Sequence, residues 1–177
     1  MKSRFLVLLP VMVFLFGCTI SEKEKEVNAI SKLERVLKAE KDVNKELASA
    51  EELIQKSIAF AEKYPEDTTS ASLLFKAADV ARGIGENETA IALWGKVNAE
   101  YENHKTATEA IFLQAFTYDQ GMNDKVKAKQ YYKFFMEKYP DHQLIKDVKL
   151  MLKQYNESKS DLELIKECKK KNEGAVE

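Results

Sequence analysis

The feature that most constrains the fold of this chain is an internal repeat, in which residues of similar type recur every 37 to 38 positions. A shift of 38 positions pairs Leu74 with Phe112, Ala77 with Ala115, Gly83 with Gly121, Ala90 with Ala128, Trp94 with Tyr132, Val97 with Phe135 and Tyr101 with Tyr139. The words Lys63-Tyr64-Pro65 and Lys138-Tyr139-Pro140 extend the pattern. A period of this length predicts units that bury their apolar faces against neighbouring copies of themselves.

Each unit has the composition of two helices. Residues 49–154 are rich in Ala, Leu, Lys and Glu, poor in Gly and Pro, and free of apolar-polar alternation, which predicts helix throughout. Small residues such as Ala77 and Ala90 let two antiparallel helices approach closely. Trp94 and Val97, three positions apart, are large enough to fill the space between the helices.

Glycine and proline mark the ends of these helices. Gly83 and Gly85 predict the turn within a unit, because glycine ends helices without steric cost. Pro65 and Pro140 each follow a tyrosine and bias that tyrosine out of helical geometry, which closes the unit.

We expect a solenoid that follows a charged tether over residues 18–28, which has too little apolar surface to fold alone. The helical repeat domain is expected over residues 29–168, and a disordered basic and polar tail over 169–177. The expected helices are 30–39, 46–64, 70–83 paired with 88–101, 106–120 paired with 124–139, and 143–154. A last helix, opened by the capping box Ser160-Asp161-Leu162-Glu163, is expected to cap the solenoid.

The helix pairs resemble tetratricopeptide (TPR) repeats. Gly85, Ala90 and Trp94 match the turn glycine, the small residue and the aromatic position of that family in spacing. The unit here is longer than the family's unit of about 34 residues. Asn123 stands where the second turn glycine is expected. The longer unit is similar to that of TPR lipoproteins of the bacterial envelope. The resemblance implies an all-α solenoid of helix-turn-helix units with a concave binding surface.

The N-terminus predicts export and a lipid anchor. Lys2 and Arg4 precede an apolar run of about a dozen residues, which is too short to span a bilayer and typical of a signal peptide over residues 1–17. The run ends in Leu15-Phe16-Gly17-Cys18, which resembles the lipobox of bacterial lipoproteins. This resemblance implies that Cys18 is diacylated and becomes the mature N-terminus. Thr19 is not the Asp of an inner-membrane retention signal, which favours the periplasmic face of the outer membrane; the inner membrane and the other face stay open.

The concave surface is the predicted binding site. In TPR arrays the first helix of each unit lines this surface, and the resemblance places six residues there: Phe75, Asp79, Arg82, Phe116, Asp119 and Gln120. Arg82 is the strongest candidate, because its planar guanidinium can hold a carboxylate with two hydrogen bonds. A surface arginine that stabilises a helix C-terminus is the simpler interpretation of the same residue.

Composition and motifs argue against other classes of function. The net charge of −1 becomes −3 once Lys2 and Arg4 are removed, with both signs interspersed, so no nucleic-acid surface is expected. No catalytic motif, cofactor-binding loop or metal-ligand cluster is present in the sequence, and we expect no enzyme, no cofactor and no metal. His104 and His142 are separated by the repeat period, so they should occupy equivalent turns. Cys168 has no partner for an internal disulfide once Cys18 is lipidated, and its role stays open.

The sequence therefore predicts a membrane-anchored scaffold of the bacterial cell envelope that binds one or more envelope proteins or extended peptides. Outer-membrane protein assembly and wall-membrane coordination are the pathways that the resemblance implies. The alternative is an accessory lipoprotein that holds a peptide or glycan ligand in the groove.

Overall fold

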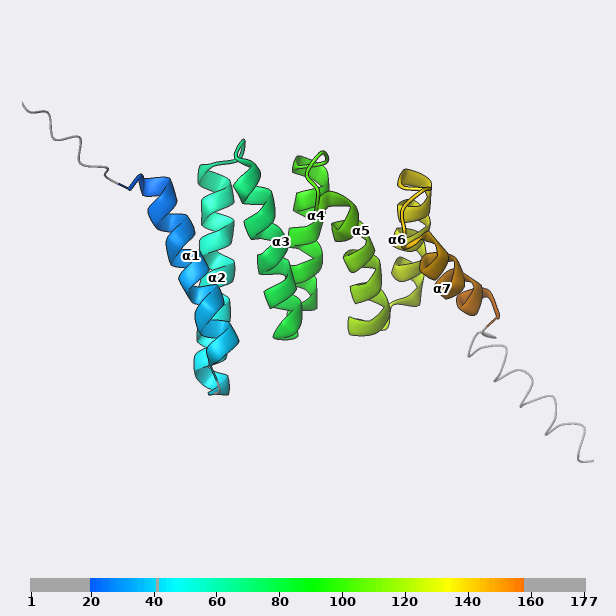
Figure 1. The fold of residues 1–177 in the computed structure, drawn as a ribbon. Coiled ribbons are helices and arrows are strands. Elements are labelled where there is room, and N and C mark those ends of the chain that lie inside the picture. Colours follow the sequence, from blue (N-terminus) through cyan, green and yellow to red (C-terminus); the bar gives the residue numbers. More distant parts are fainter. Residues whose placement is uncertain (1–19, 41, 158–177) are drawn as a thin grey trace, which may run out of the picture.

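The computed structural model describes residues 20–40 and 42–157. These residues form α-helices, one π-helical segment and no strand. In Figure 1 the odd-numbered helices form one layer and the even-numbered helices lie behind it, so the chain zigzags between two layers. The elements are α1 (Glu22–Ala39), α2 (Val43–Lys63), α3 (Thr68–Gly83), α4 (Asn87–Glu100), α5 (Ala107–Phe116), η1 (Thr117–Gly121), α6 (Lys125–Lys138) and α7 (Ile145–Glu157). The predicted all-α, TPR-like helical-repeat fold is confirmed.

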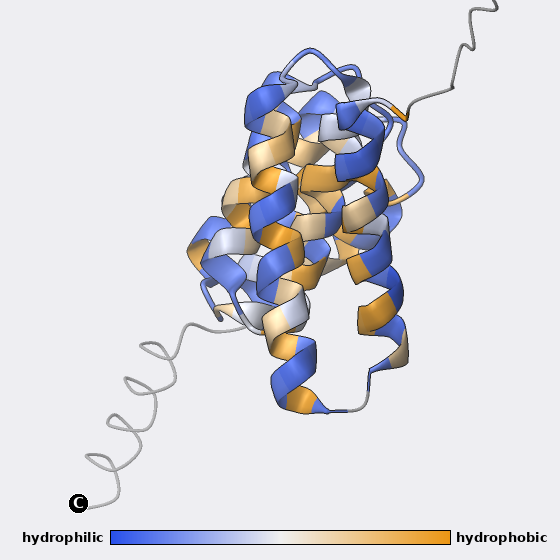
Figure 2. Cartoon of the chain, turned by 90° about the vertical axis from the view of Figure 1, so that its left-hand side faces the viewer, coloured by the Kyte–Doolittle hydropathy of each residue, from blue (hydrophilic) through white to orange (hydrophobic). Residues whose placement is uncertain are grey.

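The core lies between the two layers, where the small and large residues of the repeat meet. In the view from the α1 end, hydrophobic and polar segments alternate along each helix (Figure 2). Ala77, Ala78 and Ala90 have no exposed surface, and this allows α3 and α4 to pack closely. The expected space-filling residues are also fully buried in both units: Trp94, Val97, Tyr132 and Phe135.

The turns that lead into α3, α5 and α7 share one hydrogen-bonding pattern. In each turn a tyrosine carbonyl accepts the backbone N–H three residues later, in the pairs Tyr64 with Asp67, Tyr101 with His104 and Tyr139 with His142. The φ of Tyr101, which is followed by Glu102, is −128°, the same as that of Tyr64 before its proline. The same turn therefore ends α4 although no proline follows Tyr101.

His104 and His142 occupy equivalent turns, as their spacing predicts. The Nδ1 atom of each accepts the backbone N–H two residues later, from Thr106 and Leu144, at 3.3 Å. Asp67 does the same in the first turn, where a carboxylate oxygen accepts the N–H of Thr69 at 2.8 Å. The two histidines thus help to begin helices α5 and α7.

The turns inside the units require a left-handed residue. Gly85 has a φ of 87°, and Asn123, one repeat later in the chain, has a φ of 53°. Asparagine tolerates this conformation better than most residues, because its short polar side chain can bond locally. The expectation that Asn123 replaces a turn glycine is confirmed.

The second unit differs from the first in the helix that precedes this turn. We expected one α-helix over residues 106–120, but α5 ends at Phe116 and continues as the π-helical segment η1. The N–H of Met122 donates to the carbonyl of Thr117, five residues earlier, at 3.0 Å. This wider turn rotates the residues that follow Phe116 around the helix axis.

The expectation that residues 18–28 form an unfolded tether is wrong for residues 22–28, which are the first turns of α1. The charges that suggested a spacer instead pair with α2 and α3. Lys63 Nζ lies 2.8 Å from Glu22 and 2.7 Å from Glu26, and Lys23 Nζ lies 2.7 Å from Asp67. The helical domain thus begins at Glu22 rather than at residue 29, and α1 and α2 form a further helix pair.

Several expectations fall outside the described residues. They are the signal peptide 1–17, lipidation of Cys18, the helix from Ser160, Cys168 and the tail 169–177. The expected helix over 143–154 corresponds to α7. Over residues 20–40 and 42–157, no helix combines the length and apolar character needed to span a membrane.

Candidate functional site

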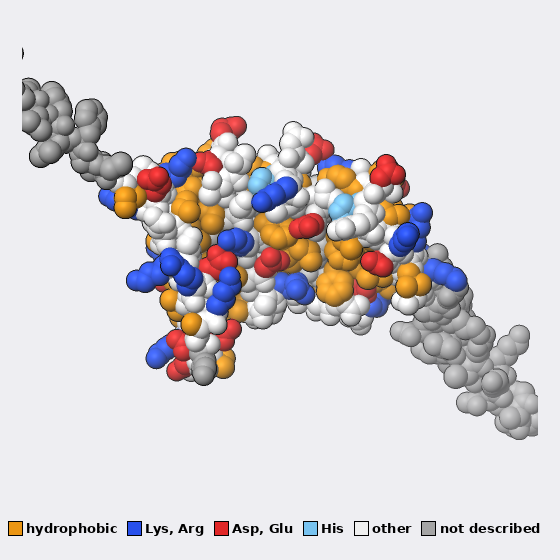
Figure 3. Space-filling model, viewed as in Figure 1, with side chains coloured by type: hydrophobic (Ala, Val, Ile, Leu, Met, Phe, Trp, Pro, Cys, Tyr) orange, Lys and Arg blue, Asp and Glu red, His pale blue; other side chains and the backbone are white. Residues whose placement is uncertain are grey.

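The candidate site lies on the layer of odd-numbered helices, where α3 and α5 are neighbours (Figure 1). The space-filling view of this face shows hydrophobic surface between charged groups in the middle of the molecule (Figure 3). Phe75 on α3 and Leu113 and Phe116 on α5 are only partly buried. We call this surface between α3 and α5 the groove; its residues are Phe75, Asp79, Arg82, Glu109, Leu113, Phe116 and Gln120.

Three of the six predicted groove residues come together in one pocket. Arg82 lies near the end of α3, and Phe116 and Gln120 lie at the end of α5 and in η1. The pocket has a volume of about 230 Å³. Its lining residues are Arg82, Gly85, Asn87, Phe116, Thr117, Gln120 and Gly121.

Arg82 is the charged residue in the lining of this pocket, and it is exposed. Its guanidinium carbon lies 5.8 Å from the centre of the Phe116 ring, a cation-π contact that bridges α3 and α5. Among the described residues no carboxylate lies within salt-bridge distance of this guanidinium. Its N–H donors are therefore available to a ligand, and a carboxylate is the group that fits them best.

The floor of the pocket is formed by a close contact between the two turns. The Asn87 side-chain amide donates to the Gly121 carbonyl at 3.2 Å. A Cβ atom on Gly121 would lie 2.7 Å from the Asn87 side-chain oxygen, so only glycine allows this contact without a shift. Asn87 was not predicted from the sequence, because only the packing of the two turns places it opposite Gly121.

Asp79 lies one helical turn before Arg82 and faces solvent, as expected for the groove. Desolvation by the surrounding protein raises its pKa, and the negative charge of Glu109 on α5 raises it further, while Arg82 lowers it. Asp79 is thus influenced by a cation on its own helix and by an anion on the neighbouring α5. Sequence analysis did not single out Glu109, because nothing in its spacing separates it from the solvated carboxylates of other helices.

Phe75 of α3 lies where the groove meets the core. Its ring is partly buried and lies 6.4 Å from the Trp94 ring of α4. It therefore contributes both to the core and to the apolar surface of the groove.

The expectation that Asp119 lines the groove is wrong. Its side chain is only 5% exposed and forms an ion pair with Lys125 at the start of α6. Burial opposes ionisation of Asp119, but hydrogen bonds from Lys125, Tyr155 and Gln120 outweigh it and lower its pKa. The repeat gives the reason, because a shift by one repeat places Asp119 on the buried Ala81 rather than on Asp79.

The fold defines a helical-repeat protein, and the groove is a surface shared by successive units. Residues 109–142, which span most of α5, η1 and α6, match the tetratricopeptide repeat family. A comparison with curated proteins found no match. The chain thus contains a tetratricopeptide repeat, a unit found in scaffolds for protein-protein interaction.

Proposed function

We propose that this protein is a lipid-anchored scaffold of the bacterial cell envelope that binds an extended segment of a partner protein in the groove. The observation that carries the proposal is the pocket formed by Arg82, Phe116 and Gln120, in which the guanidinium has no carboxylate partner among the described residues.

The chemistry of the groove defines the segment that it accepts. Arg82 takes a carboxylate of the segment with two hydrogen bonds. Phe116 and Phe75 offer partly exposed rings to an apolar side chain. Asp79 and Glu109 attract a cationic group or backbone N–H donors. A segment that carries an acidic, an apolar and a basic residue matches this set of groups.

Anchoring is supported by the sequence alone. The lipobox-like Leu15-Phe16-Gly17-Cys18 supports diacylation of Cys18 after export. We propose the periplasmic face of the outer membrane as the location, and outer-membrane protein assembly or wall-membrane coordination as the process served.

The test is photo-crosslinking in intact cells from groove and control positions. Phe116 is replaced by a photoreactive phenylalanine analogue, which preserves an aromatic ring at that site. Val126 on α6 is 70% exposed and lies outside the groove, so the same replacement there is the matched control. The crosslinking is repeated in an Arg82→Ala background.

A partner protein captured from position 116, absent from position 126 and lost with Arg82→Ala supports the proposal and identifies the pathway. If position 116 yields no protein adduct although the folded protein is present, the scaffold function is wrong. The alternative, a small peptide or glycan ligand, then predicts a thermal shift of the purified protein with that ligand.

A further inference from the structure

The start of α1 determines how far the domain can lie from a lipid attached to Cys18. Ser21 and Glu24 form a capping box: the Ser21 hydroxyl accepts the Glu24 N–H at 3.2 Å, and the Glu24 carboxylate accepts the Ser21 N–H at 3.0 Å. This reciprocal pair satisfies donors that are otherwise exposed at a helix start. The helix therefore begins at Glu22, and only the three residues Thr19, Ile20 and Ser21 separate it from Cys18.

The first turns of α1 are held to the rest of the domain on two sides. Lys63 of α2 pairs with Glu22 and Glu26, and Lys23 pairs with Asp67 before α3. Each exposed pair contributes little, but Val27 and Ile30 add apolar contacts in the same turns. The beginning of α1 is thus part of the folded domain and does not lengthen the connection to the anchor.

From this geometry we propose that the N-terminal end of α1 lies directly against the lipid bilayer, with no spacer between membrane and solenoid. The inference rests on the lipidation of Cys18 proposed above. Three extended residues span about 11 Å, so the bilayer surface is within that distance of the first turn of α1.

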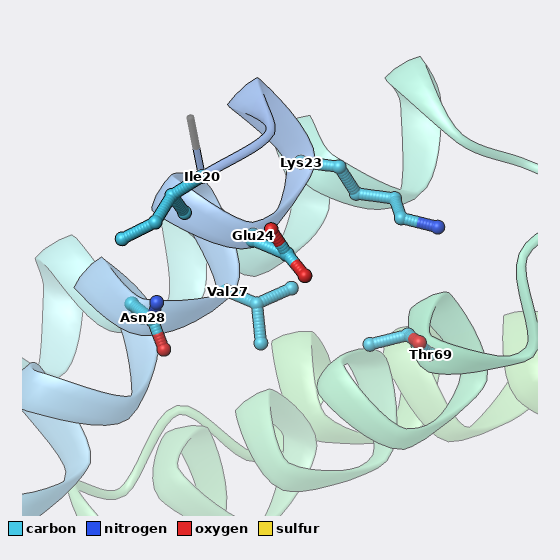
Figure 4. A pocket seen from close by; sticks show the side chains of 6 residues that line it. All are labelled: Ile20, Lys23, Glu24, Val27, Asn28 and Thr69. Atoms are coloured by element: carbon cyan, nitrogen blue, oxygen red, sulfur yellow. The ribbon is translucent and has the colours of Figure 1, made fainter. Parts of the chain in front are cut away.

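The surface at this end of the molecule suits an interfacial position. Ile20 is 55% exposed and projects beside Val27 over a hollow of about 430 Å³ between α1 and the start of α3 (Figure 4). Figure 4 shows Lys23, Glu24 and Thr69 around the same hollow. The exposed aliphatic side chain next to the anchor loses water contact when it meets the headgroup region.

The charges near the anchor do not favour anionic lipid. Acidic and basic residues alternate from Glu22 to Glu26, so their net attraction to a negative surface is small. The length of the connection, rather than lipid charge, holds the end of α1 at the membrane.

The experiment measures the distance of two sites from the bilayer in the full-length, lipidated protein. A fluorophore is attached to Lys25→Cys in the first turn of α1, or to Lys45→Cys at the opposite end of the α1-α2 pair, each with Cys168→Ala. The protein is reconstituted into vesicles of phosphatidylethanolamine with or without phosphatidylglycerol, and lipids with nitroxide headgroups serve as quenchers. Both positions are exposed.

We expect quenching at position 25 to be several-fold stronger than at position 45, and equal in both vesicle compositions. A Gly/Ser linker of about 20 residues inserted between Thr19 and Ile20 has an average span of about 25 Å and should reduce the quenching at position 25 to that at position 45.

Equal quenching at the two positions of the parent, in protein that fractionates with membranes, would overturn the inference and leave the anchor intact. Retention of a Cys18→Ser variant in the membrane fraction would overturn the lipid anchor and, with it, this inference. The two failures are thus distinguishable.

Discussion

At the residue scale, the hydroxyls of Tyr132 and Tyr155 are both buried but have different surroundings. Tyr132 has no exposed surface, and its hydroxyl finds no hydrogen-bond partner among the described residues. The Tyr155 hydroxyl of α7 is also buried, but it lies close enough to the Asp119 carboxylate to lower the pKa of that carboxyl. Burial raises the pKa of both tyrosines.

Substitution by phenylalanine is therefore expected to change the free energy of unfolding in different ways at the two positions. Tyr155→Phe removes a hydroxyl that stabilises the ionised Asp119 carboxylate and should lower the free energy of unfolding by about 1 kcal/mol. Tyr132→Phe removes a buried hydroxyl without a partner and should leave this free energy unchanged or raise it by up to about 1 kcal/mol. Urea unfolding followed by circular dichroism measures both. An equal loss in the two variants would mean that Tyr132 has a partner after all.

At the element scale, α1 is a structural helix of the domain. Ile30 is 3% exposed and packs in the same core as Leu53 and Leu74, whereas Val36 on the same helix is 36% exposed. Ile30→Ala should lower the free energy of unfolding by about 2–4 kcal/mol, and Val36→Ala should change it by less than about 0.5 kcal/mol. Denaturant unfolding of the two variants is the measurement; similar, small effects would mean that α1 does not contribute to the core.

The ion pair between Lys23 of α1 and Asp67 before α3 predicts that the free energy of unfolding depends on pH. Hydrogen bonds from the Lys23 ammonium and from Thr69 lower the pKa of Asp67 to about 2. Because this pKa is below the ordinary aspartate value of about 3.9, the stabilisation is complete above that value and is lost as the pH falls toward 2.

Asp67→Asn tests this charge while keeping a residue that can cap α3. Relative to the parent, the variant should lose up to about 1 kcal/mol of unfolding free energy at neutral pH, since the pair is partly exposed, and nothing near pH 2. Glu51 on α2 is exposed and forms no described ion pair, so Glu51→Gln is the control and should match the parent throughout. A difference between Asp67→Asn and the parent that stays constant with pH would exclude the Lys23 ion pair as its cause.

At the scale of the whole molecule, the apolar interior has two parts. One cluster joins α1 to α4 and includes Ala110, and the other joins α5, α6 and α7. In a solenoid each unit is stabilised mainly by its neighbours, so a local defect should spread over a limited range.

Hydrogen exchange should reveal these two parts. Val148 is fully buried in the second cluster, and Val148→Ala should lower amide protection in α6 and α7 while α1 and α2 keep the protection of the parent. Leu53→Ala, in the first cluster, should show the reverse pattern. A uniform loss of protection in either variant would show instead that the array unfolds as a single unit.

Predictions from the sequence were correct at positions where the residue type fits only one kind of environment, such as the core or a tight turn. The repeat predicted the buried Trp94 and Tyr132, and it placed Asn123 at the position of a turn glycine, where the structure has a positive φ. It failed for the charged residues 22–28, where the Ser21-Glu24 capping box was the unused signal. It also failed for Asp119, where the repeat register was not applied to the groove residues.

By itself, the sequence determined the all-α repeat, its period, several helix ends and most of the core, because spacing, side-chain volume and turn chemistry are local properties of the chain. Only the tertiary structure decided which charges are paired. Glu22 and Glu26 look like solvated spacer residues until α2 places Lys63 beside them, and the pairing of Asp119 with Lys125 depends on the turn between η1 and α6. Lys63 lies 41 and 37 positions after Glu22 and Glu26 in the sequence, and only the packing of α1 on α2 brings these side chains together.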